Sequence, residues 1–86
     1  MKFVISAHAL EESQLRKISL NIIDTILENP DQMVEEYGGK KAYQSRIELG
    51  SGKTYLVGVI VKEYVDHALV VTVDKTGKID KYWRVP

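Results

Sequence analysis

The 86 residues carry no formal net charge at neutral pH, 44% of them are hydrophobic, and none is a cysteine. The lack of cysteine excludes disulfides and Cys-ligated metal sites, so stability must come from one apolar core. No apolar run approaches the roughly 20 residues that span a bilayer, and the run at 3–5 is too short for a signal peptide. We therefore expect one cytoplasmic domain over residues 1–86, with no membrane partner.

The charged residues are distributed unevenly along the chain. Residues 1–37 hold three Lys/Arg and seven Asp/Glu, a net charge of −4, whereas residues 38–86 hold nine and five, a net charge of +4. This asymmetry is compatible with a basic working surface and gives modest support to a polyanionic partner. The alternative is a protein that binds nothing charged, in which such asymmetry is also common.

The first third of the chain predicts a short strand followed by two helices. Residues 2–5 have strand character, and Ser6 is suited to cap a helix over 7–17. Ser19 is suited to cap a second helix that ends near residue 29. The apolar residues of this second helix follow the i, i+3, i+4 spacing of a core-facing helix: Leu20, Ile22, Ile23, Ile26 and Leu27.

After residue 30 the hydrophobic period changes from 3.6 to 2, which predicts strands at 33–37, 42–49, 54–61, 68–73 and 78–85. The stretch 54–61 is apolar at both odd and even positions, so both of its faces should be covered and it should be the central strand. Gly58 within it marks a bulge or a close approach of another group to the backbone. The connections are short enough for a meander. We therefore predict an α+β fold of order β-αα-ββββ, in which two N-terminal α-helices pack on a twisted antiparallel β-sheet.

The sheet face opposite the helices should be solvated and cationic. In the predicted last strand Lys78, Tyr82 and Arg84 alternate with the apolar set, and Arg46 has the same orientation in its strand. Cations beside a phenol are what a phosphodiester-binding surface needs. The alternative is a face that is polar only because antiparallel sheets often leave one side in water.

His8, Glu12 and Arg16 recur every four residues, so they should lie in a row on the first helix. The positive end of the helix disfavours protonation of His8, which would keep a ring nitrogen available as a general base. The alternative is an ordinary Glu12–Arg16 pair that stabilises the helix by about 0.3–0.5 kcal/mol. The spacing alone leaves both interpretations open.

Other motifs predict no metal and no cofactor. The stretch GSGKT ends like a phosphate-binding loop, but Ile47 stands where that motif needs its first glycine, and the stretch joins two strands. It should be a hairpin turn. The two histidines, His8 and His67, have no partners at zinc-ligand spacing.

The segments SAHALEESQLRKIS, ILENPDQMVEEYGG, AYQSRI and VVTVDKTGKIDKYWR together resemble the family called domain of unknown function 4258, over nearly the whole chain. The resemblance implies a RelE/ParE/BrnT-like toxin fold and the toxin half of a bacterial type II toxin–antitoxin pair. Its partners would be a cognate antitoxin protein and RNA, in particular mRNA on or off the ribosome. An exposed edge strand leaves a homodimer open.

For this family the resemblance implies a metal-independent endoribonuclease that cleaves RNA through attack of its own 2′-hydroxyl. His8 would serve as base or acid, Tyr82 as the complementary group, and Lys78 would stabilise the charge of the phosphorane. The residues that bind RNA phosphates would be Arg16, Arg46 and Arg84.

Two positions depart from the family pattern. Glu12 stands where an arginine is usual, and Asp74 stands where an aromatic residue is common. Each puts a negative charge in place of a phosphate or base contact. These departures favour an alternative function, a non-catalytic RNA- or protein-binding module derived from a toxin.

Overall fold

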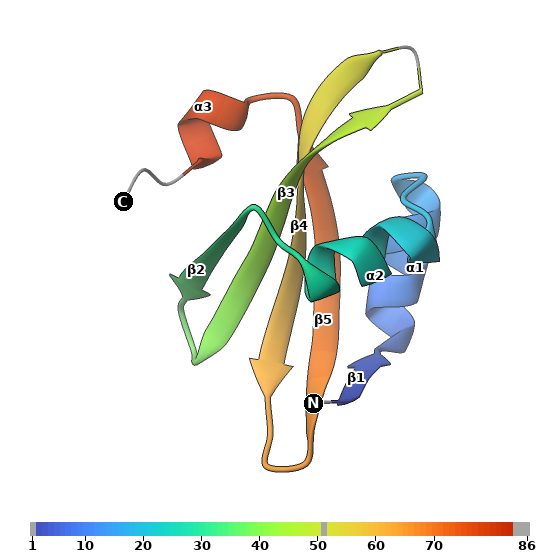
Figure 1. The fold of residues 1–86 in the computed structure, drawn as a ribbon. Helices are drawn as coiled ribbons and strands as arrows, with labels where there is room; N and C mark the ends of the chain where they lie inside the picture. Colours follow the sequence, from blue (N-terminus) through green and yellow to red (C-terminus); the bar gives the residue numbers. More distant parts are fainter. Residues whose placement is uncertain (1, 51, 84–86) are drawn as a thin grey trace.

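The computed structural model describes residues 2–50 and 52–83. The strands are β1 (Lys2–Ile5), β2 (Gln32–Glu36), β3 (Lys40–Leu49), β4 (Lys53–Glu63) and β5 (His67–Thr76). The helices are α1 (Ala7–Leu15), α2 (Leu20–Glu28) and α3 (Ile79–Tyr82). The strands form a five-stranded sheet in the spatial order β1-β5-β4-β3-β2, and β1 runs parallel to β5 while the other neighbours are antiparallel (Figure 1). Within these ranges no helix has the length and apolar character needed to cross a membrane.

The core lies between the sheet and the two N-terminal helices. Ser19 caps α2 by accepting a hydrogen bond from the Ile22 amide at 3.2 Å. The apolar side of α2 then packs on one face of the central strands, in a cluster that includes Ile23, Ile26, Val57, Val59 and Val61. Because side chains alternate along a strand, the residues between these valines face the other way. We call that second surface the far face; it carries Gln44, Leu56, Gly58, Ile60, Asp74 and Thr76.

A β-bulge in β5 changes its alternation halfway along the strand. The register between β4 and β5 shifts between Ile60 and Val61, which leaves Val71 as the extra residue. As a result Val70 and Val73, three positions apart, both lie in the core. Asp74, which follows the buried Val73, then points to the far face, where it is paired with Gly58 of β4.

α1 is attached along the part of β5 that β1 does not reach, since β1 pairs only with residues 67–70. Ser6 Oγ donates to the carbonyl of the bulged Val71 at 3.2 Å and accepts from the Ala9 amide at 3.0 Å as the N-cap of α1. At the other end of the helix, Arg16 Nε donates to the carbonyl of Val73 at 3.2 Å. Both ends of α1 therefore bind main-chain carbonyls of β5.

The predicted antiparallel sheet and the order β-αα-ββββ are wrong. The sheet is mixed, because β1 pairs in parallel with β5, and the order is β-α-α-β-β-β-β-α. The strand predicted at 78–85 is absent from its described part, where α3 forms instead; positions 84 and 85 lie outside the described residues. The strands predicted at 33–37, 42–49, 54–61 and 68–73 correspond to β2, β3, β4 and β5.

The turn after β5 explains why no further strand follows beside it. Thr76 Oγ1 accepts a hydrogen bond from the Lys78 amide at 3.0 Å, which bends the chain out of the line of β5. The free side of β5 is already occupied by β1 and α1. The chain therefore leaves the sheet and forms α3, whose Asp80 and Lys81 suit the N- and C-terminal ends of a short helix.

Lys17 ends α1 in a conformation that normally favours glycine. Its φ is 57°, and the amide of the next residue, Ile18, donates to the carbonyl of Ser13 at 2.8 Å, as in a Schellman-type C-terminus. For a residue with a Cβ this left-handed conformation costs about 1–2 kcal/mol.

Lys17→Gly should therefore stabilise the protein. Glycine adopts the left-handed conformation without the steric cost, and this gain outweighs the larger conformational entropy of glycine in the unfolded chain. The free energy of unfolding in urea should rise by roughly 0.5–1 kcal/mol. Lys17→Ala is the matched control, because it removes the same charge and keeps the Cβ. A glycine variant no more stable than the alanine variant would contradict this assignment.

Candidate functional site

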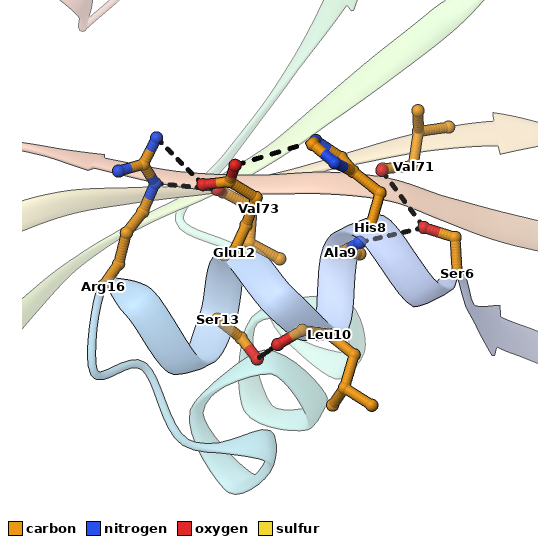
Figure 2. A network of polar contacts seen from close by, with 9 residues as sticks. All are labelled: Ser6, His8, Ala9, Leu10, Glu12, Ser13, Arg16, Val71 and Val73. Atoms are coloured by element: carbon orange, nitrogen blue, oxygen red, sulfur yellow. Dashed lines mark hydrogen bonds and ion pairs between the residues drawn. The ribbon is translucent and has the colours of Figure 1, made fainter.

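His8, Glu12 and Arg16 lie in one row on α1, as their spacing predicts. Figure 2 shows the imidazole and the guanidinium on either side of the carboxylate: His8 Nε2 is 3.8 Å from Glu12 Oε1, and Arg16 Nη2 is 3.1 Å from Glu12 Oε2. The His8 side chain is 61% exposed. The row is thus open to solvent, with its carboxylate paired to the arginine.

Arg16 is engaged in contacts within the protein. Besides Glu12, its guanidinium binds the Val73 carbonyl, and its own carbonyl accepts from Lys75 Nζ at 2.8 Å (Figure 2 shows the Glu12 and Val73 contacts). These contacts fasten α1 to β5. Arg16 and Lys75 thus each donate to oxygen atoms of the protein itself.

The other predicted site residues lie elsewhere. Arg46 stands on the far face of β3, where its guanidinium lies 4.3 Å from the ring centroid of Trp83. Lys78 occupies the N-cap position of α3 and is exposed, and Tyr82 belongs to α3 itself. Arg84 lies outside the described residues. The predicted residues therefore fall into two groups, one on α1 and one at α3 and the adjoining part of β3.

The far face contains a pocket of about 590 Å³ between the sheet and α3. Its floor is apolar, and Leu56, one of the floor residues, is only 2% exposed. Tyr82 is the one predicted catalytic residue among the described residues that line it. The full lining is Glu36, Gln44, Leu56, Ile60, Asp74, Lys75, Thr76 and Tyr82.

Gly58 makes room for an acidic group in this pocket. It pairs with Gln44 on one side and with Asp74 on the other, so the three residues form one line across β3, β4 and β5. A Cβ at position 58 would lie 2.7 Å from Asp74 Oδ1, closer than real Cβ contacts allow. The glycine thus lets the Asp74 carboxylate lie directly over β4, which confirms the close approach that its sequence position suggests.

The amide of Gln44 presents an unused acceptor. Its Oε1 is buried and has no hydrogen-bond partner among the described residues. A buried polar atom without a partner costs about 1–3 kcal/mol, so such atoms are rare in native structures. Because Gln44 also lines the pocket, a ligand with a hydrogen-bond donor is one way to satisfy it.

The environment of Asp74 makes its ionised form less favourable. Packing of protein atoms around the carboxyl raises the pKa of Asp74, the positive charge of Arg16 lowers it, and the negative charge of Glu36 raises it. The contact with the Gly58 backbone lowers it further, but the net shift is upward. The upward shift therefore comes mainly from desolvation of the Asp74 carboxyl, since the attraction of Arg16 is larger than the repulsion of Glu36.

Sequence reasoning missed most of this pocket. Glu36 and Thr76 carry no signal of their own, and Asp74 stands out in the sequence only as a departure from the family pattern. Two sequence features pointed to the pocket: a glycine, Gly58, within an apolar strand, and Gln44 on the solvent-facing side of its strand. Among the described residues no group of three or more His, Cys, Asp or Glu is placed to hold a metal ion.

Asp74→Asn should stabilise the protein at neutral pH. Because the pKa of Asp74 is higher in the folded than in the unfolded state, the folded wild type binds more protons and loses stability as pH rises through the window between the two values. The amide removes this penalty. Chemical unfolding at pH 7 should show a gain that disappears below the ordinary aspartate pKa of 3.8.

The matched control is Asp24→Asn, which removes an exposed charge from α2 and leaves the pocket intact. A gain of the same size and pH dependence in both variants would assign the effect to overall charge rather than to the pocket.

Comparison with known proteins identifies the family but no individual relative. A search of curated proteins and a search of solved structures gave no match. The family model described as "Domain of unknown function (DUF4258)" matches residues 5–74, which is most of the chain and includes α1, α2 and the strands up to Asp74. The chain therefore belongs to the DUF4258 family, as its sequence segments indicated.

Proposed function

We propose that this chain is a protein-binding module whose far face receives a partner protein, the non-catalytic alternative that the sequence left open. The observation that carries the proposal is the chemistry of the pocket. Asp74 and Glu36 line it with negative groups, which repel phosphate and attract donors, and Gln44 adds a buried acceptor without a partner.

The distribution of cations supports the same proposal. Lys75 lines the pocket, but its ammonium group binds the Arg16 carbonyl. The guanidinium of Arg46 lies over Trp83. A phosphate entering the pocket would therefore meet carboxylates and would have to displace existing contacts to reach a cation, whereas tight binding of RNA depends on accessible Lys and Arg.

The second candidate is the metal-independent endoribonuclease toxin that the family resemblance implied. Its support is the row on α1, where His8 is exposed beside Glu12 and Arg16. In this candidate the row would act without Tyr82, because Tyr82 lies against the far face and α1 packs at β5 on the other side of the sheet.

The first test is co-expression with the protein encoded by the adjacent reading frame. The wild-type chain and His8→Ala should both form a complex of fixed stoichiometry with it in size-exclusion chromatography. No complex with the wild-type chain would contradict the protein-binding function.

The second test measures RNA directly. The purified chain should leave a single-stranded RNA oligonucleotide intact, and both His8→Ala and Lys78→Ala should leave growth and RNA profiles on induction unchanged. Cleavage by the wild-type chain that His8→Ala abolishes would support the nuclease and contradict the binding module.

A further inference from the structure

The far-face pocket is large enough to admit a long side chain of a partner, and its lining suits one. Its volume of about 590 Å³ lies within the roughly 300–1,000 Å³ of ligand pockets. Leu56 and Ile60 give it an apolar floor. Asp74, Glu36 and Gln44 supply carboxylate and amide oxygens, and Thr76 and Tyr82 add hydroxyl groups. An apolar floor with several acceptors above it suits a long side chain that is aliphatic along its stem and cationic at its end.

We propose that this pocket binds the guanidinium group of an arginine side chain presented by the partner protein. The proposal rests on the protein-binding function given above and names the chemical group that the far face recognises.

The arrangement of acceptors distinguishes a guanidinium from an ammonium. Gln44 and Asp74 lie on β3 and β5, on either side of Gly58, so the pocket draws its acceptors from two different strands. A planar fork with five N–H donors can bind several separated acceptors at once, whereas an ammonium is a compact point charge. Gln44 Oε1 is buried without a partner, so a fork can satisfy it once the Gln44 side chain turns toward the pocket.

Tyr82 provides a second feature that suits a guanidinium. It lines the pocket from α3, opposite the sheet, and its side chain combines an aromatic ring with a hydroxyl. The ring already has one cation beside it, since Lys81 Nζ lies 5.4 Å from its centroid. A guanidinium that enters the pocket can stack on the ring as well as donate to the carboxylates. A cation in the pocket would also lie near the carboxylates of Asp74 and Glu36, which both line it.

The direct test is a titration of the ¹⁵N-labelled full chain with N-acetyl-arginine amide, followed by NMR. Chemical-shift changes should centre on the amides of Gln44, Gly58 and Asp74. N-acetyl-lysine amide should bind about tenfold more weakly, because it lacks the fork. The citrulline analogue, which has nearly the shape of arginine but no charge, should give no saturable shifts in the pocket.

Two variants test the residues that carry the proposal. Asp74→Asn should weaken arginine-analogue binding about tenfold, as expected for loss of one charge-assisted contact. Gly58→Ala should weaken it similarly, because the new methyl group displaces the end of the Asp74 side chain while β4 keeps its conformation. Asp24→Asn, outside the pocket, should bind as the wild type does, and thermal unfolding checks that each variant is folded.

The results separate this proposal from the function on which it rests. Equal binding of the arginine and citrulline analogues, shifts centred away from the pocket, or full binding by Asp74→Asn would each overturn the guanidinium site. If the partner complex then still forms, the protein-binding function stands with a different mode of recognition. If the arginine analogue binds as expected but no partner complex forms, the pocket chemistry stands and the partner protein as its source is wrong.

Discussion

The hydrogen bonds of Ser6 are the constraint on which much of the structure depends. The same hydroxyl begins α1 by accepting from the Ala9 amide and fastens it to β5 by donating to the carbonyl of the bulged Val71. Without it the bulge would leave a partly buried carbonyl without this partner, at a cost of about 1–3 kcal/mol. With Arg16 bound to Val73 at the other end, α1 is fixed along β5.

The position of α1 also determines where the end of the chain goes. Because β1 and α1 occupy the free side of β5, a hairpin beyond Thr76 has no strand edge to join. The Thr76–Lys78 turn directs the chain to the far face instead, and α3 forms one wall of the pocket there. A contact that stabilises the helix-bearing side of the sheet thus contributes to a cavity on its opposite side.

Periodicity predicted the individual elements well but not their arrangement. The apolar spacing around Ile23 and Ile26 found α2, and the alternation after residue 30 found four strands, because both patterns follow from burial of one side. The parallel pairing of β1 has no such local signal, since it depends on which strand edge is free after folding. The last stretch resembles a strand in sequence because Ile79 and Trp83 fall on the same side of an alternating pattern. The Thr76 turn and the occupied edge of β5 decide its conformation instead.

The site was less predictable than the fold because it depends on how several strands are aligned with one another. The row on α1 follows from helical spacing and lies as expected, although its three members say nothing about where Tyr82 or Lys78 lie. The pocket arises from the register of three strands and from a one-residue bulge. Neither is encoded in the alternation of any single strand, so Glu36 and Thr76 could not be assigned to a site from the sequence.

Arg16 is shared by two acidic neighbours that do not touch each other. Glu12 is 3.1 Å away on the helix, and the charge of Arg16 also acts on Asp74 across β5. Neutralising Asp74 therefore removes one attraction between α1 and β5, while the Arg16–Glu12 pair within the helix and the hydrogen bond to Val73 remain. Reciprocity of this charge interaction means that a charge placed beside Asp74 on the far face is also felt at the last turn of α1, through one guanidinium.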